Sequence, residues 1–307
     1  MQPLPAALTE RVVILDGGLA TELERRGHDL SSRLWSARLL ADDPAAVRDV
    51  HHAFFAAGAE LATTASYQAS VDGLAAHGLD AGAMLRRSVE LARQARDEHG
   101  AGWIAASIGP YGAALADGSE YRGWYGLTVS QLRSFHRPRM EILAAAGPDV
   151  LAIETIPCLA EVEAVLAELE RVAMPAWLSI TAAAGDRTRA GEPLARGFAM
   201  ARDCSSVFAV GVNCVAPGDV PAAVALAVQH GGRPAVAYPN SGEGWDAGRR
   251  DWTGARAFAP DAAVSWVRAG ARMVGGCCRV GPADIGALAE TIRALPARPT
   301  VGPGASG

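Results

Sequence analysis

Residues 271–279, Ala-Arg-Met-Val-Gly-Gly-Cys-Cys-Arg, place two adjacent cysteines directly after a short apolar run. The run predicts a buried strand, in which neighbouring side chains point to opposite faces. Cys277 and Cys278 can therefore serve one centre only where the strand has ended or is distorted, and Gly275 and Gly276 relax the backbone limits at that point. Taken alone, the pair fits a metal site about as well as it fits the alternatives, which are ordinary buried small residues or a strained vicinal disulfide.

A third cysteine lies at the end of another apolar run, because Cys214 follows residues 207–213. Three thiols at two strand ends indicate a metal site with three protein ligands and one open position, the pattern of catalytic zinc. Thiolates also favour zinc over magnesium or calcium. We expect Cys158 and Cys204 to lie outside the site. The seven histidines all fall in predicted helices or loops, where we expect ordinary helix or surface roles: His28, His51, His52, His77, His99, His136 and His230.

The chain alternates short apolar runs with helical patterns. Strands are predicted at 12–15, 60–65, 103–108, 150–154, 176–181, 207–212, 234–238 and 271–275, and helices over 44–57, 81–98, 128–146, 159–172, 219–230, 260–269 and 282–294. Continuous apolar runs are expected where a parallel sheet is covered on both faces. The pattern predicts an α/β protein with one (β/α)8 TIM barrel over residues 1–307 and a loose tail from about 296. A doubly wound open sheet is the alternative.

Polar residues collect directly after the predicted strands, at the end where a barrel places its active site. Glu154 ends an apolar strand, where a carboxylate is costly unless paired; a substrate ammonium or a structural arginine could pair with it. Asp16-Gly17-Gly18 is either a turn or a place where backbone N–H groups meet a ligand carboxylate. Long segments at 109–127, 182–198 and 239–258 predict lids or binding loops. Together these features describe a pocket for an amino acid that carries a thiol.

The amino-acid composition excludes several kinds of catalysis and several kinds of partner. The 307 residues are 50% hydrophobic with a net charge of −5, and all 28 basic residues are arginine. Without lysine, Schiff-base aldolase chemistry and lysine-linked pyridoxal phosphate are excluded. The mild negative charge and the lack of an arginine run predict no nucleic-acid partner, and no apolar stretch predicts a signal peptide or a membrane span. Five cysteines at irregular spacing predict a reducing cytoplasm rather than a secreted disulfide scaffold.

Zinc held by three thiolates has a formal charge of −1, which makes it a poor Lewis acid and a poor activator of water. Such a centre is better suited to a substrate thiol, which coordination deprotonates. A zinc hydrolase or lyase is disfavoured because histidine ligands are missing. A non-enzymatic zinc or thiol sensor remains as a second class of function, although it would not need the pocket carboxylates.

Seven motifs run in order through nearly the whole chain: LDGGLATEL (15–23), TTASYQAS (63–70), GSEYRGWY (118–125), ETIP (154–157), GVNC (211–214), YPNSGE (238–243) and GGCCR (275–279). With them the chain resembles the zinc-dependent homocysteine S-methyltransferases. The resemblance implies a barrel with Zn²⁺ at Cys214, Cys277 and Cys278. It also implies that Asp16, Gly17 and Glu154 hold the amino-acid part of homocysteine, and that Asn240 occupies the open zinc position before substrate arrives, as in some members.

The motifs GSEYRGWY and YPNSGE look most like the branch that uses S-methylmethionine and often S-adenosylmethionine. The resemblance implies methyl transfer from a sulfonium to zinc-bound homocysteine thiolate, as in methionine biosynthesis. A selenocysteine methyltransferase of the same branch is the alternative; the extra segments of the cobalamin- and betaine-using members are not expected. Four aromatic residues are candidates for cation–π contact with the sulfonium: Trp103, Trp124, Tyr125 and Trp245. Only small-molecule partners are expected, and the sequence predicts no oligomeric state.

Overall fold

The structure, a computed structural model, describes residues 2–32, 34–183, 185–246 and 251–296. Its main sheet is parallel and has eight strands in the order β1-β10-β7-β6-β5-β4-β3-β2. These are β1 (Val13–Ile14), β2 (Leu61–Thr63), β3 (Trp103–Ile108), β4 (Val150–Ile156), β5 (Ala176–Ile180), β6 (Val207–Asn213), β7 (Ala235–Tyr238) and β10 (Ala271–Val274). The remaining pair, β8 (Gly244–Asp246) and β9 (Asp251–Thr253), forms a separate antiparallel hairpin.

The two ends of the sheet, β1 and β2, meet through Glu60. Its backbone N–H donates to the Ile14 carbonyl oxygen at 2.8 Å, and its side chain accepts from the Ile14 N–H at 3.0 Å. The strands therefore follow one another around a nearly closed ring in chain order. A doubly wound sheet would instead reverse its strand order at a switch point, so the predicted (β/α)8 barrel is confirmed.

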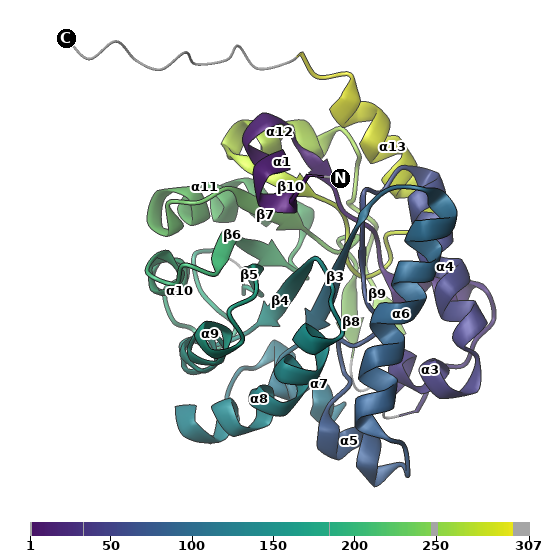
Figure 1. Cartoon of the computed structure of the whole chain (residues 1–307). Helices are drawn as coiled ribbons and strands as arrows, with labels where there is room; N and C mark the ends of the chain where they lie inside the picture. The colour runs from purple at the N-terminus through teal and green to yellow at the C-terminus, as the bar shows by residue number, and fades with distance from the viewer. Residues whose placement is uncertain (1, 33, 184, 247–250, 297–307) are drawn as a thin grey trace.

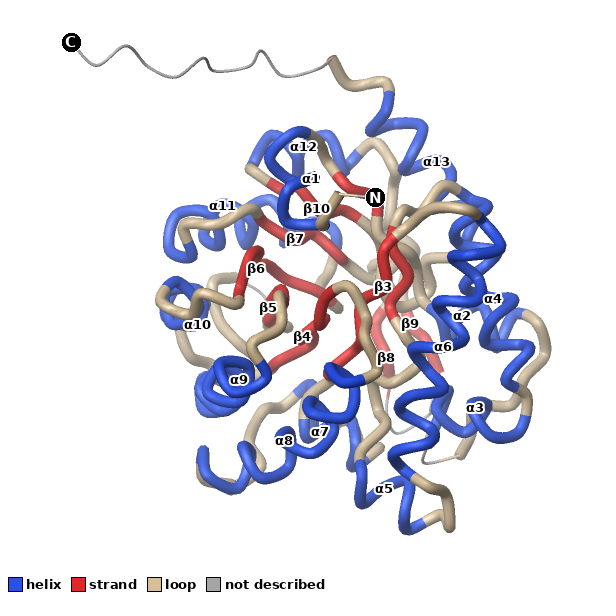
Figure 2. Tube along the Cα trace, in the orientation of Figure 1, coloured by secondary structure: helices blue, strands red, loops and turns tan. Residues whose placement is uncertain are grey.

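Helices surround the strands on the outside (Figures 1 and 2). They are α2 (Leu19–Arg25), α3 (Leu39–Asp42), α4 (Pro44–Ala57), α5 (Val71–Ala76), α6 (Ala81–His99), α7 (Tyr111–Leu115), α8 (Val129–Ala145), α9 (Leu159–Val172), α10 (Leu194–Arg202), α11 (Val220–Gly231), α12 (Ala262–Ala269) and α13 (Pro282–Arg293). Single 3-10 turns lie at η1 (Trp35–Arg38), η2 (Ser119–Tyr121) and η3 (Pro217–Asp219). All the predicted helices are present, and a capping box of Thr128 and Gln131 opens α8. None of the described helices has both the length and the apolar character that a membrane crossing requires.

Six helices are absent from the sequence prediction: α1 (Leu4–Glu10), α2, α3, α5, α7 and α10. Helix α1 buries Leu4 and Leu8 in the cluster that fills the barrel interior. The helix is too short to show a clear helical repeat of apolar residues in the sequence. Helix α10 occupies part of the segment 182–198 that was predicted as one long loop. Gly197 interrupts its helical pattern, and a side chain there would lie 2.5 Å from Ile180, so the glycine is needed for close packing on β5.

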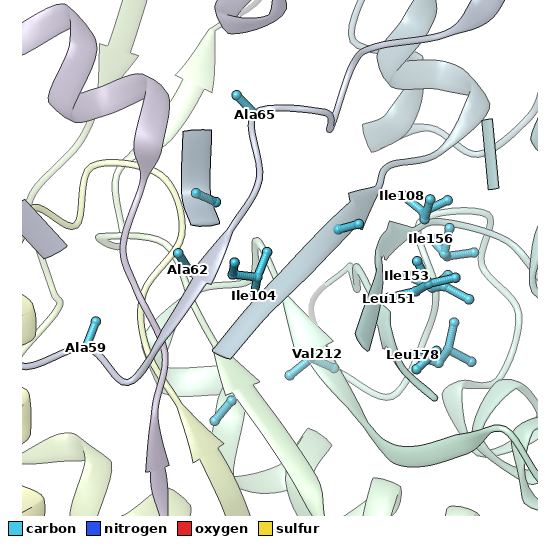
Figure 3. Packing of buried hydrophobic residues seen from close by; sticks show 14 of the residues in the cluster. Ala59, Ala62, Ala65, Ile104, Ile108, Leu151, Ile153, Ile156, Leu178 and Val212 are labelled. Carbon is cyan, nitrogen blue, oxygen red and sulfur yellow. The ribbon is translucent and has the colours of Figure 1, made fainter. Parts of the chain in front are cut away.

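Strand residues alternate between the barrel interior and the helical shell. In β4, Val150 and Ala152 belong to the interior cluster. Leu151 and Ile153 pack outward with the residues of the helical shell (Figure 3). Because side chains alternate along the strand, Glu154 points inward at its carboxyl end. The local pattern of β4 therefore delivers a carboxylate to the mouth of the barrel.

Glu168 of α9 joins two neighbouring helices, and its side chain is only 1% exposed. Its carboxylate accepts from Arg133 Nε at 2.7 Å and Arg137 Nε at 2.8 Å on α8. The Arg137 hydrogen bond lowers the pKa of Glu168 to about 2, with Arg133 acting in the same direction. This carboxylate therefore stabilises the fold above pH ~4.5, and the contribution is lost as the pH falls towards 2.

Glu168→Gln is expected to lower the free energy of unfolding at pH 7 by about 1.5–3 kcal/mol, the value of a hydrogen bond to a charged group. Urea unfolding at pH 7 and pH 3 measures the effect, which should shrink at the lower pH. Glu141→Gln is the matched control, because Glu141 makes only an exposed 3.7 Å pair with Arg171 and should change little. Equal stability of the Glu168 variant and wild type at pH 7 would contradict this role.

Candidate metal centre and substrate pocket

Three thiols meet at the carboxyl ends of β6 and β10. The Sγ of Cys214 lies 2.7 Å from that of Cys277 and 4.0 Å from that of Cys278, and the last two are 3.9 Å apart. Tetrahedral zinc with Zn–S bonds of ~2.3 Å would separate its sulfurs by about 3.8 Å, so two distances fit and the third is shorter. All three are free thiols, which disagrees with a vicinal disulfide. In the part of the chain that the structure describes, this is the one group of three metal-binding side chains.

The adjacent cysteines reach one point because β10 has ended at Val274. Beyond it the chain bonds to the segment after β7: Cys277 N–H donates to the Pro239 carbonyl at 2.6 Å, and Cys278 O accepts from Ser241 N–H at 2.9 Å. Neither Gly275 nor Gly276 has a positive φ, so the left-handed conformation is not the reason for glycine at these positions. They are needed for space instead: a side chain on Gly275 would lie 2.6 Å from Leu15, and one on Gly276 would overlap Val280.

Two site residues that are not glycine adopt the left-handed conformation. Thr155 near the end of β4 has φ 61°, and Cys214 just after β6 has φ 52°. Asn213 joins these two positions: its Oδ1 accepts from Thr155 N–H at 2.7 Å, and its Nδ2 donates to Thr155 Oγ1 at 2.6 Å. Strained backbone of this kind persists where the surroundings hold it, often at functional sites. No role was predicted for Asn213, although its position directly before Cys214 was a signal.

Glu154 lies beside the thiols with only polar neutral partners. It accepts from Ser107 Oγ at 2.5 Å and from Asn213 Nδ2 at 3.3 Å. Burial raises the pKa of Glu154 to about 8, and the charges of Cys214 and Asp16 act in the same direction. Within the described residues no arginine pairs with Glu154, so the structural-arginine alternative has no support. The carboxylate is left available for a cation that arrives with a ligand.

Asp16 completes the acidic side of the pocket. It accepts from Thr63 N–H at 2.6 Å, from Thr63 Oγ1 at 3.0 Å and from the Tyr238 hydroxyl at 2.6 Å. Burial raises the pKa of Asp16 to about 6, and these hydrogen bonds oppose the rise. The sequence did not single out Tyr238 or Ser107, since a contact between residues 222 positions apart leaves no local pattern.

Gly17, Gly18 and Asn240 lie around the same mouth. A side chain on Gly17 would lie 2.5 Å from both Phe54 and the Val280 carbonyl. The Gly18 N–H donates to that carbonyl at 2.9 Å and is therefore not available to a substrate carboxylate. Asn240 Oδ1 accepts from Gly242 N–H at 2.9 Å, so its side chain lies within its own turn after β7. The substrate roles of Gly17 and Asn240 stay predictions.

The sequence profile of the homocysteine S-methyltransferases matches residues 13–292. Homocysteine S-methyltransferase YbgG of Bacillus subtilis is 41% identical over 315 aligned residues, which cover 96% of this chain and 99% of the relative. An Escherichia coli homocysteine S-methyltransferase is 46% identical, over 93% of this chain and 97% of its own. The chain belongs to the homocysteine S-methyltransferase family. It is accordingly a methyltransferase.

Crystal structures of the E. coli homocysteine methyltransferase MmuM resemble this family member closely. The metallated form superposes with a TM-score of 0.85 at 42% identity, over 94% of this chain and 99% of MmuM. The apo form gives a TM-score of 0.77 over 94% of this chain and all of MmuM. The oxidized form gives a TM-score of 0.84, so the metallated and oxidized forms fit the present methyltransferase about equally well and the apo form fits less well.

The aromatic residues that were predicted to contact the methyl donor of this methyltransferase have different surroundings in the structure. The expectation for Trp103 is wrong: it lies at the amino end of β3, in the interior cluster with α1, and its Nε1 donates to Gln2 O at 3.0 Å. Trp124 is 75% exposed, and Tyr125 packs edge-on against Tyr111 with ring centroids 5.3 Å apart. The side chain of Trp245 lies outside the described residues. Neither Cys158 nor Cys204 belongs to the thiol group found in the described residues.

Proposed function

We propose that this protein transfers a methyl group from a sulfonium donor to the sulfur of homocysteine, giving methionine, with zinc as its metal. The observation that carries the proposal is the group of three free thiols, within 4.0 Å of one another at the barrel mouth. Beside them lie two buried carboxylates that have no basic partner among the described residues. The thiols supply the sulfur ligands that zinc favours. The carboxylates supply the charge that an amino-acid substrate requires. The whole barrel serves as one catalytic domain.

Cys214, Cys277 and Cys278 fit zinc in ligand type, in number and in closeness. When bound there, zinc would accept the homocysteine sulfur at its open position and favour the thiolate form of that sulfur. The protein must keep all three thiols reduced for this purpose, because a disulfide between any two would remove the ligand set. That requirement supports a reducing compartment such as the cytoplasm.

Glu154 and Asp16 bind the ammonium group of homocysteine. With the substrate sulfur next to the cysteines, the amino-acid end extends towards β1 and β4, where both carboxylates lie buried. A cation favours the ionised form of Glu154, whose pKa burial raises to about 8 in the free protein. The Gly17 N–H would meet the substrate carboxylate. Asn240 would leave its turn to contact the open side of the site before the substrate arrives.

Methyl transfer consumes a positive and a negative sulfur at the same time. A pocket that excludes water favours such a step, because it disfavours the separated charges. Glu154, Asn213 and Cys214 are all buried, and Asn213 fixes the strand end that carries Glu154. These residues hold the acceptor sulfur and its amino-acid group in one orientation, away from water.

The donor is proposed to be S-methylmethionine ahead of S-adenosylmethionine. The loop after β3 packs closely over the segments after β4 and β5: a side chain on Gly123 would lie 2.9 Å from Pro157 O and 3.1 Å from Ala190 Cβ. A large adenosyl group would have to displace this loop, whereas the small S-methylmethionine would not. Discrimination between the two donors should appear in kcat/KM.

Initial rates with zinc-loaded, reduced protein and fixed homocysteine test the proposal. We expect methionine to form fastest from S-methylmethionine, detectably from S-adenosylmethionine and not from betaine. A preference for betaine would contradict the sulfonium donor, and the absence of methionine with every donor would contradict the function. Selenocysteine as a second acceptor tests the alternative within the branch, which a higher kcat/KM than that of homocysteine would favour.

A further inference from the structure

Glu120 is a buried carboxylate that the proposed mechanism does not use. It lies in η2, within the loop after β3, and is 9% exposed. Its Oε2 has no hydrogen-bond partner in the described part of the chain. The nearby cation, Arg122, turns instead to Ser119 Oγ at 2.9 Å and to Asp117 at 3.6 Å. A carboxylate is costly to bury without a partner, so the position implies a positive partner that arrives with a ligand.

The loop that carries Glu120 is linked to the segment after β6 through Arg189. Burial raises the pKa of Glu120 to about 7, and the charge of Cys214 acts in the same direction. Next to it, the Tyr121 ring lies 5.4 Å from the guanidinium carbon of Arg189, whose Nη2 donates to the Cys214 carbonyl at 3.4 Å. Glu120 and Tyr121 therefore belong to the wall of the metal centre, although they come from a loop on another part of the barrel.

The backbone around Glu120 is held on both sides. A side chain on Gly112 would collide with the backbone nitrogen of Glu120, and Gly123 is packed against Pro157 and Ala190. Ser119, the preceding residue, donates its N–H to Asp117 Oδ1 at 2.9 Å. These contacts fix where the carboxylate lies, so its burial is a feature of the folded loop.

We propose that Glu120 binds the positively charged sulfur of the methyl donor. This assignment rests on the proposed function for the identity of the donor as a sulfonium. The donor sulfur must come within a methyl group's reach of the homocysteine sulfur, and therefore beside the thiols that Glu120 faces. The ammonium and carboxylate of S-methylmethionine are separated from its sulfur by two methylene groups and lie farther from that point. The charge that Glu120 meets is then the sulfonium.

The assignment has a kinetic consequence. Glu120 attracts the donor before transfer, and the attraction fades as the methyl leaves and the positive charge disappears. Glu120→Gln should therefore raise the donor KM by about tenfold or more, because the attraction between two opposite charges at a buried site is lost, while kcat falls much less. Product methionine, whose sulfur is neutral, is released more readily than the donor.

A binding experiment without homocysteine measures how much the positive charge of the donor sulfur contributes to donor affinity. Calorimetry on zinc-loaded protein compares S-methylmethionine with 2-amino-5-methylhexanoate, which has the same shape but a neutral carbon in place of the sulfonium. Wild type should bind the sulfonium at least tenfold more tightly, and Glu120→Gln should reduce that ratio to near one with unchanged zinc content and homocysteine affinity. Glu120→Asp should keep part of the preference. Asp117→Asn, which removes a negative charge from the same loop but keeps an Oδ1 acceptor for Ser119, is the control and should keep the full ratio.

The outcomes separate this assignment from the proposed function. An unchanged ratio in Glu120→Gln, an equal loss for both ligands, or a wild type without any sulfonium preference would each overturn the role of Glu120. Failure of the function itself would appear elsewhere, as wild-type protein that forms no methionine from homocysteine and any sulfonium. The binding ratio can still be measured in that case.

Discussion

Cys214→Ala, Cys277→Ala and Cys278→Ala are each expected to abolish metal binding and methyl transfer. The three sulfurs lie within 4.0 Å of one another and together form the proposed ligand set. Each variant therefore removes one of the three protein ligands. Loss of an outer-shell partner already weakens metal binding by about 10- to 100-fold, and loss of a direct ligand should exceed that. Wild type purified under reducing conditions should hold about one zinc per chain.

Metal analysis after dialysis, followed by methionine formation, measures this effect. Cys158→Ala is the matched control, because Cys158 is a buried cysteine that precedes α9 and lies outside the thiol group. It should keep both zinc and activity. Circular dichroism on every variant separates metal loss from unfolding. Full retention of zinc by a folded variant would remove that cysteine from the proposed ligand set.

Glu154→Gln is expected to weaken homocysteine binding by roughly 10- to 150-fold, which corresponds to about 1.5–3 kcal/mol for a hydrogen bond to a charged group. Zinc should stay, because the thiol group is unchanged. The reason is the buried position of Glu154 beside the thiols, with neutral partners only. Glu163→Gln, an exposed change on the helix that follows β4, is the matched control.

The pH dependence of this affinity tests the same residue. Burial raises the pKa of Glu154 to about 8, so the free protein carries a proton there at lower pH. Binding of an ammonium requires the ionised form, and homocysteine affinity should therefore fall as the pH drops below about 8. Calorimetry between pH 6.5 and 8 on wild type and on Glu154→Gln isolates the contribution of Glu154 to the pH dependence. The titrating groups of homocysteine itself affect the two proteins equally. Equal affinities and equal pH profiles would show that Glu154 is structural.

The sequence by itself determined the barrel and the meeting of the three thiols. Apolar runs at strand spacing, separated by helical patterns, are local signals that survive whatever loops join them. Once the strands are parallel and in chain order, their carboxyl ends must share one mouth. Cys214 and Cys278 then lie 4.0 Å apart although 64 positions separate them in the chain. Strand direction should also have excluded Trp103, which begins its strand and therefore lies at the far end of the barrel.

Only the tertiary structure decided the surroundings of the site. The contacts of Tyr238 with Asp16 and of Ser107 with Glu154 join segments far apart in the chain, and the burial of Glu120 depends on the close packing of the loop after β3. The hydrophobic pattern of a helix repeats every three or four residues, and that of a strand repeats every two. The path of a loop has no such period, because it is fixed by the close packing and hydrogen bonds of the finished fold. The sequence could therefore indicate the metal ligands, but not the carboxylate that we propose for the donor.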